Sequence, residues 1–503
     1  MTSMIFDKDI SNIKNIINSH NIVNSNNKIQ MGEVFTPFNL IIEMVDHFPK
    51  SLWKNPNLKW LDPGSGIGNF SMIIYHYLNN GLKSWEPDKV KRHNHIISNM
   101  IYMIEISDKN IKIAKKVFGN SVNICHCDFI KEQHIWKKQF NLTSFDIIYG
   151  NPPYNTNGMR GKGRSNPGLR VLWTQFLNYS LDILNKNGYI LYLTPNSWTE
   201  LKSPLAKKML TNNNILVLKN FDVVNSYKLF DKQAGSLPLS YYLLHNSNDT
   251  YKSTLIFDST FDKYIEFNIR KYMIIPNKNI ELIKKVLNKN ENSLSSYFKF
   301  TPPKDKKDKK LYSNTNRHPF IYPLINYVHK KIYISYAKNP TYVQNKRPKL
   351  IFPNYSMGYP ILDINGILDV GGRSSYYIEI PDNSISKLRK IQKLFLTNFA
   401  LTIINSLKTA QKFMSTRTFN IFPDVTKFNF DINDTTIQKY YNFNKDHLYS
   451  INKQLNDGEG NLSNNQIEQL LNFSISNYKK SNTATTNKKN KYKNKTHSKT
   501  IKK

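Results

Sequence analysis

The four residues Asn151-Pro152-Pro153-Tyr154 combine groups that could act on a weakly nucleophilic amine. They follow the apolar run 145–149, so they stand where a strand is expected to end. The proline pair fixes the backbone, which lets the Asn151 side chain and the Pro152 carbonyl point at one spot. Two acceptors on the N–H groups of an aryl amine would restore electron density to its nitrogen. Tyr154 adds a flat face on which a ring can stack. A purely structural turn would not require this combination.

A glycine-rich segment, Leu61-Asp-Pro-Gly-Ser-Gly-Ile-Gly-Asn-Phe70, directly follows another apolar run. Gly64, Gly66 and Gly68 would let the backbone approach a ligand closely and turn into a helix whose N-terminus favours polar or anionic groups. Taken alone, such a turn could hold any nucleotide.

Two acidic residues end the next apolar runs. Glu105 closes the run that begins at Ile101, and an acid at the end of a second strand can bind both ribose hydroxyls of a nucleoside. The alternative for Glu105 is a solvated strand-end carboxylate. Asp128, followed by Phe129, ends the third run and fits the adenine end of the same ligand.

These residues can act together only in a fold that places the ends of several strands side by side. Short apolar runs alternate with helical patterns, which predicts an α/β fold, a mostly parallel sheet with helices on both faces. A ligand would then lie at the carboxyl ends of the strands. The runs are 59–61, 101–106, 122–127, 145–149, 188–193, 215–218 and 241–244.

The order of these motifs resembles that of the gamma-class amino-methyltransferases, which are mostly DNA adenine-N6 methyltransferases of restriction–modification systems. Residues 32–37 are similar to motif X, which wraps the methionine part of S-adenosylmethionine, and the likeness covers about residues 30–245. The further correspondences are Asp62 to Phe70 with motif I, Glu105 with motif II, Asp128-Phe129 with motif III and Asn151 to Tyr154 with motif IV.

The resemblance implies a Rossmann-like domain that transfers a methyl group from S-adenosylmethionine to N6 of an adenine flipped out of double-stranded DNA. It implies catalytic roles for Asn151, Pro152, Pro153 and Tyr154, with base stacking by Tyr154 and Phe230. It requires no metal. The implied cofactor-binding residues are Phe35, Thr36, Pro37, Asp62, Gly64, Gly66, Gly68, Glu105, Asp128 and Phe129.

The chain is strongly basic, with a formal net charge of +35. Residues 479–503 hold ten Lys and no acid, so about +25 remains on the rest of the chain. Such a charge favours a polyanionic partner. Basic residues interleaved with aromatics, such as Lys349 beside Phe352, predict a nucleic-acid face in the second half. The DNA-binding candidates are Arg160, Lys162, Arg164, Arg347, Arg373 and Arg417.

The patterns predict four parts. Residues 1–30 form a helical extension, 31–270 the catalytic domain, 271–478 a mixed α/β target-recognition domain and 479–503 a disordered lysine-rich tail. Cys125 and Cys127 are expected in a strand, because no second Cys/His pair completes a zinc site. No apolar stretch is long enough for a membrane span. We expect a monomeric, intracellular protein, cytoplasmic or nuclear, from an AT-rich genome such as that of a large DNA virus.

Two other readings stay open. The same Asn-Pro-Pro-Tyr pocket resembles those that methylate adenine in RNA or glutamine in proteins. The chain could also be a DNA-binding protein with an inactive methyltransferase domain, although such a protein need not keep Glu105, Asn151 and the glycines.

Overall fold

The computed structural model describes residue 5 and residues 36–154, 172–201, 203–211, 213–234, 237–247, 249–290, 292–301, 310–328, 332–352, 359–371, 375–408, 416–456 and 463–473. This part of the chain divides into two compact units, the first ending at Lys278 and the second beginning at Asn279. The sequence patterns had placed the corresponding boundary after residue 270. Residues 6–30 and 479–503, predicted to be a helix and a tail, lie outside the described residues.

The first unit is built on a nine-stranded sheet with the strand order β3-β2-β1-β4-β5-β7-β6-β8-β9. β7 and β9 run antiparallel to their neighbours, and the remaining pairs are parallel. The predicted α/β fold is confirmed, and β1 to β7 coincide with the seven apolar runs. The strands are β1 (Trp60–Asp62), β2 (Ile101–Glu105), β3 (Asn123–His126), β4 (Phe145–Gly150), β5 (Leu184–Pro195), β6 (Asn214–Phe221), β7 (Leu239–His245), β8 (Thr254–Asp258) and β9 (Lys263–Phe267).

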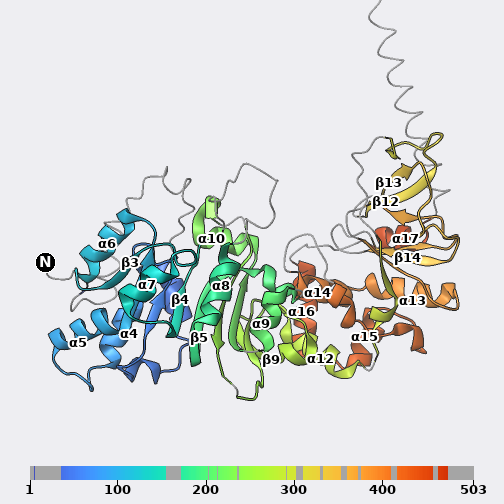
Figure 1. The fold of residues 1–503 in the computed structure, drawn as a ribbon. Helices are drawn as coiled ribbons and strands as arrows, with labels where there is room; N and C mark the ends of the chain where they lie inside the picture. The colour runs from blue at the N-terminus through green and yellow to red at the C-terminus, as the bar shows by residue number, and fades with distance from the viewer. Residues whose placement is uncertain are drawn as a thin grey trace, which may run out of the picture. The chain divides into compact units, whose positions relative to one another are not determined.

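Helices cover the sheet, and α8 can be followed alongside β5 in Figure 1. They are α3 (Phe38–Val45), α4 (Asn69–Gly81), α5 (Lys89–His95), α6 (Asp108–Phe118), α7 (Gln133–Phe140), α8 (Leu172–Asp182), α9 (Pro204–Thr211), α10 (Val223–Ala234) and α11 (Ile269–Tyr272).

Side-chain alternation along the strands gives the sheet two apolar faces. One face packs in a single core against α3, α4, α6 and α10, and this core holds Ile101, Met103, Ile147 and Tyr149. The intervening residue Tyr102 lies on the other face, where its ring meets Phe140 of α7 at 5.2 Å between centroids. Because both faces are covered, the central strands read as continuous apolar runs instead of alternating ones.

The parallel strands carry the predicted site residues to one edge of the sheet. β1, β2 and β4 end at Asp62, Glu105 and Gly150, and β1 lies between the other two. The fold therefore places the residues that follow these three strands at a common edge, as the sequence predicted.

The second unit contains two four-stranded sheets, with the orders β10-β17-β14-β15 and β11-β13-β12-β16. Its strands are β10 (Phe298–Thr301), β11 (Tyr312–Ser313), β12 (Tyr322–Val328), β13 (Ile332–Ala337), β14 (Lys349–Phe352), β15 (Ile361–Asp363), β16 (Asp369–Val370) and β17 (Ser375–Ile378). Its helices are α12 (Ile280–Lys289), α13 (Ile385–Phe395), α14 (Asn398–Leu407), α15 (Asp434–Tyr441), α16 (Lys445–Asn456) and α17 (Asn464–Leu471).

Lys349, assigned to a nucleic-acid face in the sequence analysis, is wholly buried in the second unit. Its ammonium donates to the Val343 carbonyl and, at 2.9 Å, to Asn345 Oδ1. Burial lowers the pKa of Lys349, and Asp363 opposes the shift. A buried, hydrogen-bonded cation cannot contact a phosphate, so that interpretation of Lys349 was wrong. Its neighbour Arg347 is exposed.

Cys125 and Cys127 are buried at β3, with their sulfur atoms 3.3 Å apart. Among the described residues there is no group of three His, Cys, Asp or Glu that could hold a metal ion. None of the helices described for this chain is long and apolar enough to cross a bilayer.

Replacement of Trp60 by Ala should destabilise the first unit by about 3–5 kcal/mol, because the indole is fully buried and stacks on Trp53 with 4.9 Å between centroids. Trp85→Ala is the matched control. Trp85 is 46% exposed, so its loss should change the free energy of unfolding by no more than about 0.5 kcal/mol. Urea unfolding followed by far-ultraviolet circular dichroism measures both, and equal costs would contradict the packing described for β1.

Candidate functional site

The glycine loop connects β1 to α4 and turns sharply at two of its three glycines. Gly66 and Gly68 have φ values of 56° and 93°, in the left-handed region that favours glycine. A Cβ on Gly68 would lie 2.8 Å from the Phe118 ring, so a side chain there is also excluded by contact. Gly64 has an ordinary φ, and its Cβ position is 3.5 Å from Cδ of Pro153. The glycine loop and the Asn-Pro-Pro-Tyr segment therefore touch.

Glu105 fixes the loop to the end of β2. Its carboxylate accepts hydrogen bonds from the amide of Gly66 at 2.7 Å and from the amide of Ser107 at 2.8 Å. This geometry orients the loop backbone, a role that the strand-end position of Glu105 did not by itself reveal. Each carboxylate oxygen has a second lone pair, so these bonds are compatible with the predicted contact to ribose hydroxyls.

Asp62, the last residue of β1, is a buried acid. Burial raises the pKa of its carboxyl to about 8, and the nearby Glu105 carboxylate raises it further, while a bond from the Gly64 amide opposes the shift. That amide is 3.4 Å from Oδ1, which is a long hydrogen bond. An ionised Asp62 would be costly in this position unless a cation lay nearby.

Asp128 and Phe129 follow β3 and have separate surroundings. Asp128 Oδ1 accepts from the amides of Ile130 and Lys131 at 2.9 and 3.0 Å, which closes a tight turn. Phe129 is buried, and its ring lies 5.2 Å from that of Phe176. The Phe129 side chain is thus part of the core, and a role for this pair in binding the adenine of a cofactor stays a prediction.

Asn151 begins the Asn-Pro-Pro-Tyr segment directly after β4. Its side-chain Nδ2 donates to the Thr36 hydroxyl at 3.2 Å. Its Oδ1 is buried and has no donor in hydrogen-bonding geometry among the described residues, while the Tyr154 hydroxyl interacts with the same side chain. Pro152 is buried and Pro153 is exposed. A buried acceptor without a donor costs free energy in the folded protein, and a ligand that donates to it would offset that cost.

Tyr154 packs its ring against the core of the first unit. The residue is half-buried, and burial raises the pKa of its phenol above the ordinary value of 10.0. The Tyr154 phenol therefore stays protonated and neutral over the pH range in which proteins are usually assayed.

The motif X residues reach this site from the N-terminal side. Thr36 is buried, and Pro37 precedes the first turn of α3 with an extended backbone. Phe35 lies outside the described residues. The contact between Thr36 and Asn151 joins positions that are 115 residues apart in the sequence.

The remaining predicted residues are not gathered at this edge by any described contact. Phe230, on α10, is buried in the apolar core of the first unit. Its predicted role in base stacking stays a prediction. Arg160, Lys162, Arg164 and Arg373 lie outside the described residues, and only the backbone of Arg417 is described.

The end of β5 was missed in the sequence analysis. Gly150 of β4 pairs with Tyr192 of β5, so Thr194 and Asn196 lie close to the segment that begins at Asn151. Both are buried polar residues, and the Trp198 indole donates to Ser240 Oγ at 3.0 Å. The signal that could have identified them was a polar, proline-containing sequence, Thr194-Pro-Asn-Ser-Trp198, directly after an apolar run.

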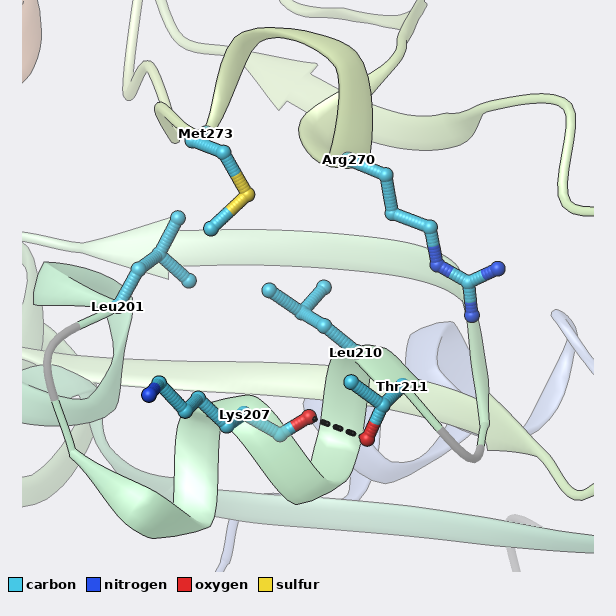
Figure 2. A pocket seen from close by; sticks show the side chains of 6 residues that line it. All are labelled: Leu201, Lys207, Leu210, Thr211, Arg270 and Met273. Atoms are coloured by element: carbon cyan, nitrogen blue, oxygen red, sulfur yellow. Dashed lines mark hydrogen bonds between the residues drawn. The ribbon is translucent and has the colours of Figure 1, made fainter.

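A separate hollow of about 320 Å³ shares no residue with this site. Figure 2 shows Leu201, Leu210 and Met273 directed toward one another, with the Arg270 guanidinium pointing away from them. That guanidinium donates to the Asn213 carbonyl at 2.9 Å and lies 4.4 Å from the centroid of the Tyr251 ring. The charged group therefore already has partners within the first unit. Lys207 and Thr211 complete the lining. The hollow lacks the convergent polar groups found at the strand ends.

The sequence has recognisable relatives. Residues 9–230 match the family model described as Eco57I restriction-modification methylase. An uncharacterized adenine-specific methylase of Mycoplasma pneumoniae is 25% identical over 306 residues, which is 46% of this chain and 70% of the relative.

The solved structures that match this chain share little sequence with it. The modification subunit of a putative type I restriction enzyme from Vibrio vulnificus is 13% identical, with a TM-score of 0.36, and covers 58% of this chain. This chain spans 60% of that subunit's length. The type IIL restriction-modification enzyme MmeI, solved in complex with DNA, is 11% identical over 90% of this chain and 79% of its own, with a TM-score of 0.47.

The family match spans the glycine loop, Glu105 and the Asn-Pro-Pro-Tyr segment, which the parallel strands bring to one edge of the sheet. The likeness to restriction–modification methyltransferases over residues 9–230 therefore includes the described residues that meet at this edge.

Proposed function

We propose that this chain transfers a methyl group from S-adenosylmethionine to N6 of adenine in double-stranded DNA. The observation that carries the proposal is the buried Oδ1 of Asn151, which has no donor in hydrogen-bonding geometry among the described residues and belongs to the segment whose Pro153 lies against Gly64 of the glycine loop. An acceptor in this position suits the N–H group of an exocyclic amine. The adenine-specific description of the Mycoplasma relative supports adenine as the base.

The residues at the strand ends fit the cofactor. The left-handed turns at Gly66 and Gly68 keep side chains out of the loop, and Glu105 holds that loop at the end of β2. The buried Asp62 carboxyl suits a ligand with a positive charge. Thr36, Pro37, Asp128 and Phe129 would complete the binding residues. When bound, S-adenosylmethionine supplies an activated methyl group on a sulfonium.

The catalytic residues act by holding the target amine. Asn151 Oδ1 and the Pro152 carbonyl accept its two N–H groups, which returns electron density to the nitrogen and points its lone pair at the methyl carbon. Pro153 keeps this backbone stiff. Tyr154 and Phe230 stack on the base once it leaves the duplex, and this stacking offsets a few kcal/mol of unpairing. The amine would lose one N–H proton to solvent after it is methylated, so no protein residue has to ionise and the rate enhancement would come from positioning.

The net charge of the chain indicates the class of molecule that it binds. A net charge of +35 favours a nucleic acid, and exposed cations such as Arg347 would bind its phosphates. We propose a monomer whose second unit recognises the target sequence. Arg160, Lys162, Arg164, Arg373 and Arg417 would add further DNA contacts.

The direct test is incubation of unmethylated bacterial genomic DNA with the protein and S-adenosylmethionine, followed by nucleoside analysis. We expect N6-methyladenine in DNA. Parallel reactions with RNA and with a glutamine-containing peptide cover the other substrates of such pockets. Methylation confined to either of these would overturn the choice of DNA, and cofactor binding without any transfer would indicate an inactive enzyme.

The Asn151→Ala variant should lose at least 100-fold in turnover, because one preorganised polar contact to the reacting group is typically worth 10²–10³. Its affinity for S-adenosylmethionine, measured by calorimetry, should stay close to that of the wild type. Glu105→Ala is the opposite control and should weaken cofactor binding first. An Asn151 variant with more than about a tenth of wild-type turnover would remove this residue from the catalytic site.

Affinity for S-adenosylmethionine should rise with pH up to about 8 and then level off. Burial raises the pKa of Asp62 to about 8, so its carboxyl is protonated below that pH, whereas a cationic ligand prefers the ionised form. Binding should release a proton below pH 8. The affinity should then change by at most about tenfold per pH unit.

Calorimetry at pH 6, 7 and 8 in buffers of different ionisation enthalpy measures both effects. Asp62→Asn should abolish the proton release. Asp182→Asn, a change at an exposed carboxylate paired with Lys208, should leave it unchanged. A pH-independent affinity in the wild type would contradict a role for Asp62 in holding the cation.

Arg347→Gln should lower the slope of log affinity against log salt by about 0.9 on duplex DNA, which is the value for one lost phosphate contact. Lys393→Gln is the control, since the Lys393 ammonium is already paired with Asp431 at 2.7 Å and should contribute less. Filter binding at several salt concentrations measures both slopes. A decrease of the same size in both variants would argue against a specific contact by Arg347.

A further inference from the structure

We infer that the loop of residues 341–347 in the second unit is a preformed DNA-contacting loop, in which the Tyr342 ring packs against sugars and base edges while Lys346 and Arg347 bind phosphates. The loop lies between β13 and β14. The inference rests on the proposed function and extends it from one cation, Arg347, to a defined surface. Three features of the loop carry it, namely an exposed ring, outward-facing cations and a set of buried polar anchors.

Tyr342 presents an aromatic ring to solvent. It is 61% exposed, more than any other large hydrophobic side chain described in the second unit. Its hydroxyl donates to the Phe300 carbonyl of β10 at 3.0 Å, so the polar end of the side chain is held while the ring stays accessible. A flat ring that is already fixed can pack on a nucleotide with little further loss of side-chain freedom.

The charges of the loop are divided between an outer and an inner side. Lys346 and Arg347 are exposed, and none of the salt bridges described for the second unit involves either of them. The two carboxylates that bond to the loop, those of Asp369 and Glu379, are buried. The solvent-facing charges of residues 341–347 are therefore all positive, which suits the phosphates of DNA.

Buried carboxylates anchor the loop near both of its ends. The Thr341 hydroxyl donates to Asp369 Oδ2 at 2.5 Å, and Asp369 belongs to β16. Asn345 Nδ2 donates to Glu379 Oε1 at 2.7 Å, directly after β17. These bonds to strands of both sheets hold the loop in one position.

Two further side chains support the middle of the loop. Gln344 Nε2 donates to the carbonyls of Pro323 and Ile367 at 3.0 and 2.9 Å. The buried Lys349 ammonium donates to the Val343 carbonyl from beneath. Lys349, which cannot reach DNA itself, thus supports the part of the chain that we assign to DNA contact.

The backbone at Lys346 is strained. Its φ of 64° lies in the left-handed region, which few residues other than glycine adopt. The Lys346 amide donates to the Gly366 carbonyl at 3.0 Å, and a Cβ on Gly366 would lie 2.2 Å from the Arg347 nitrogen. Close packing against Gly366 therefore holds the two cations in place. Strained backbone that surrounding contacts maintain is typical of ligand-contacting segments.

The Tyr342→Ala variant of the full chain tests the ring. Affinity for a duplex of about 30 base pairs and mixed sequence, measured by fluorescence anisotropy, should fall about 10-fold, as is usual for loss of one aromatic contact to a nucleotide. The slope of log affinity against log salt should not change, because no charge is removed. Tyr342→Phe keeps the ring and should retain most of the affinity.

Tyr333→Ala is the matched control. Tyr333 is also exposed, at 52%, but it lies on β13 outside the loop. Its replacement should change the affinity less than about twofold, which is the effect expected of a surface substitution without a contact. An equal loss of affinity in the Tyr333 and Tyr342 variants would overturn the assignment of the ring.

Lys346→Gln and Thr341→Val separate charge from positioning. Lys346→Gln should lower the salt slope by about 0.9, whereas Lys387→Gln, at a lysine paired with Asp382 at 2.6 Å, should lower it less. Thr341→Val removes the bond to Asp369 without a change of charge. It should weaken binding at an unchanged salt slope. Circular dichroism verifies that each variant is folded.

Steady-state methylation gives a second measurement. The KM for DNA of the Tyr342→Ala variant should rise about 10-fold, in line with the loss of one aromatic contact, while kcat at saturating DNA stays close to that of the wild type. Wild-type affinity and KM in Tyr342→Ala, together with a wild-type salt slope in Lys346→Gln, would overturn the inference.

The wild-type protein separates this inference from the proposed function. If it neither binds duplex DNA nor forms N6-methyladenine in it, the proposed function fails whatever the variants do. If it does both and the variants of the 341–347 loop behave as the wild type, the inference about the loop alone fails.

Discussion

The close approach of β1 and β4 at their carboxyl ends is the constraint on which the site depends. Gly150 has a φ of 139°, and a Cβ there would lie 2.9 Å from Asp62 Oδ1. A side chain at position 150 would displace the Asp62 carboxylate and would be strained at this positive φ. Because Gly150 lacks one, the chain can bring Asn151 next to the glycine loop, where Gly64 approaches Pro153. Under the proposed function, the distance between the cofactor and its acceptor would depend on how these two neighbouring strands end.

The same packing has an electrostatic consequence. Asp62 lies beneath Gly150 and beside Glu105, so two carboxyl groups share a region with little water. Glu105 is stabilised by two backbone amides, whereas Asp62 has one long bond from Gly64. Burial therefore opposes the ionisation of Asp62, whereas Glu105 organises the loop through its two amide bonds. Under the proposed function, Asp62 is the group whose charge state would respond to a bound cation.

The sequence predicted what depends on local pattern and missed what depends on partners distant in the chain. The apolar runs predicted the strands β1 to β7. Gly66 and Gly68 lie in left-handed turns, a backbone conformation that few other residues adopt. β8 and β9 were not predicted, since short strands at the sheet edge carry too few apolar residues to stand out. The burial of Lys349 was missed because its charge indicates exposure and its acceptors at Val343 and Asn345 are known only from the fold.

The candidate site divides in the same way. The residue types at 151–154 were enough to predict which chemistry they suit. They could not predict that Asn151 contacts Thr36, because no periodicity relates positions 115 residues apart. Which residues a side chain such as Thr36 contacts is a matter of geometry. For Thr36 that geometry is available only after α3 is placed on the sheet.

Under the proposed function, none of the groups that would hold the target amine has to change its protonation state. The Asn151 amide and the Pro152 carbonyl do not ionise at ordinary pH, and burial raises the pKa of the Tyr154 phenol. A site of this kind cannot compensate for misplaced atoms by proton transfer, so its rate depends on how firmly its acceptors are held. This explains why a neutral amide would need support from a buried threonine, a proline and the helix α3, whose Glu43 accepts from Lys219 of β6 and Tyr241 of β7. The rigidity lies in the elements around the reaction centre, and the centre itself requires only an acceptor that faces the correct way.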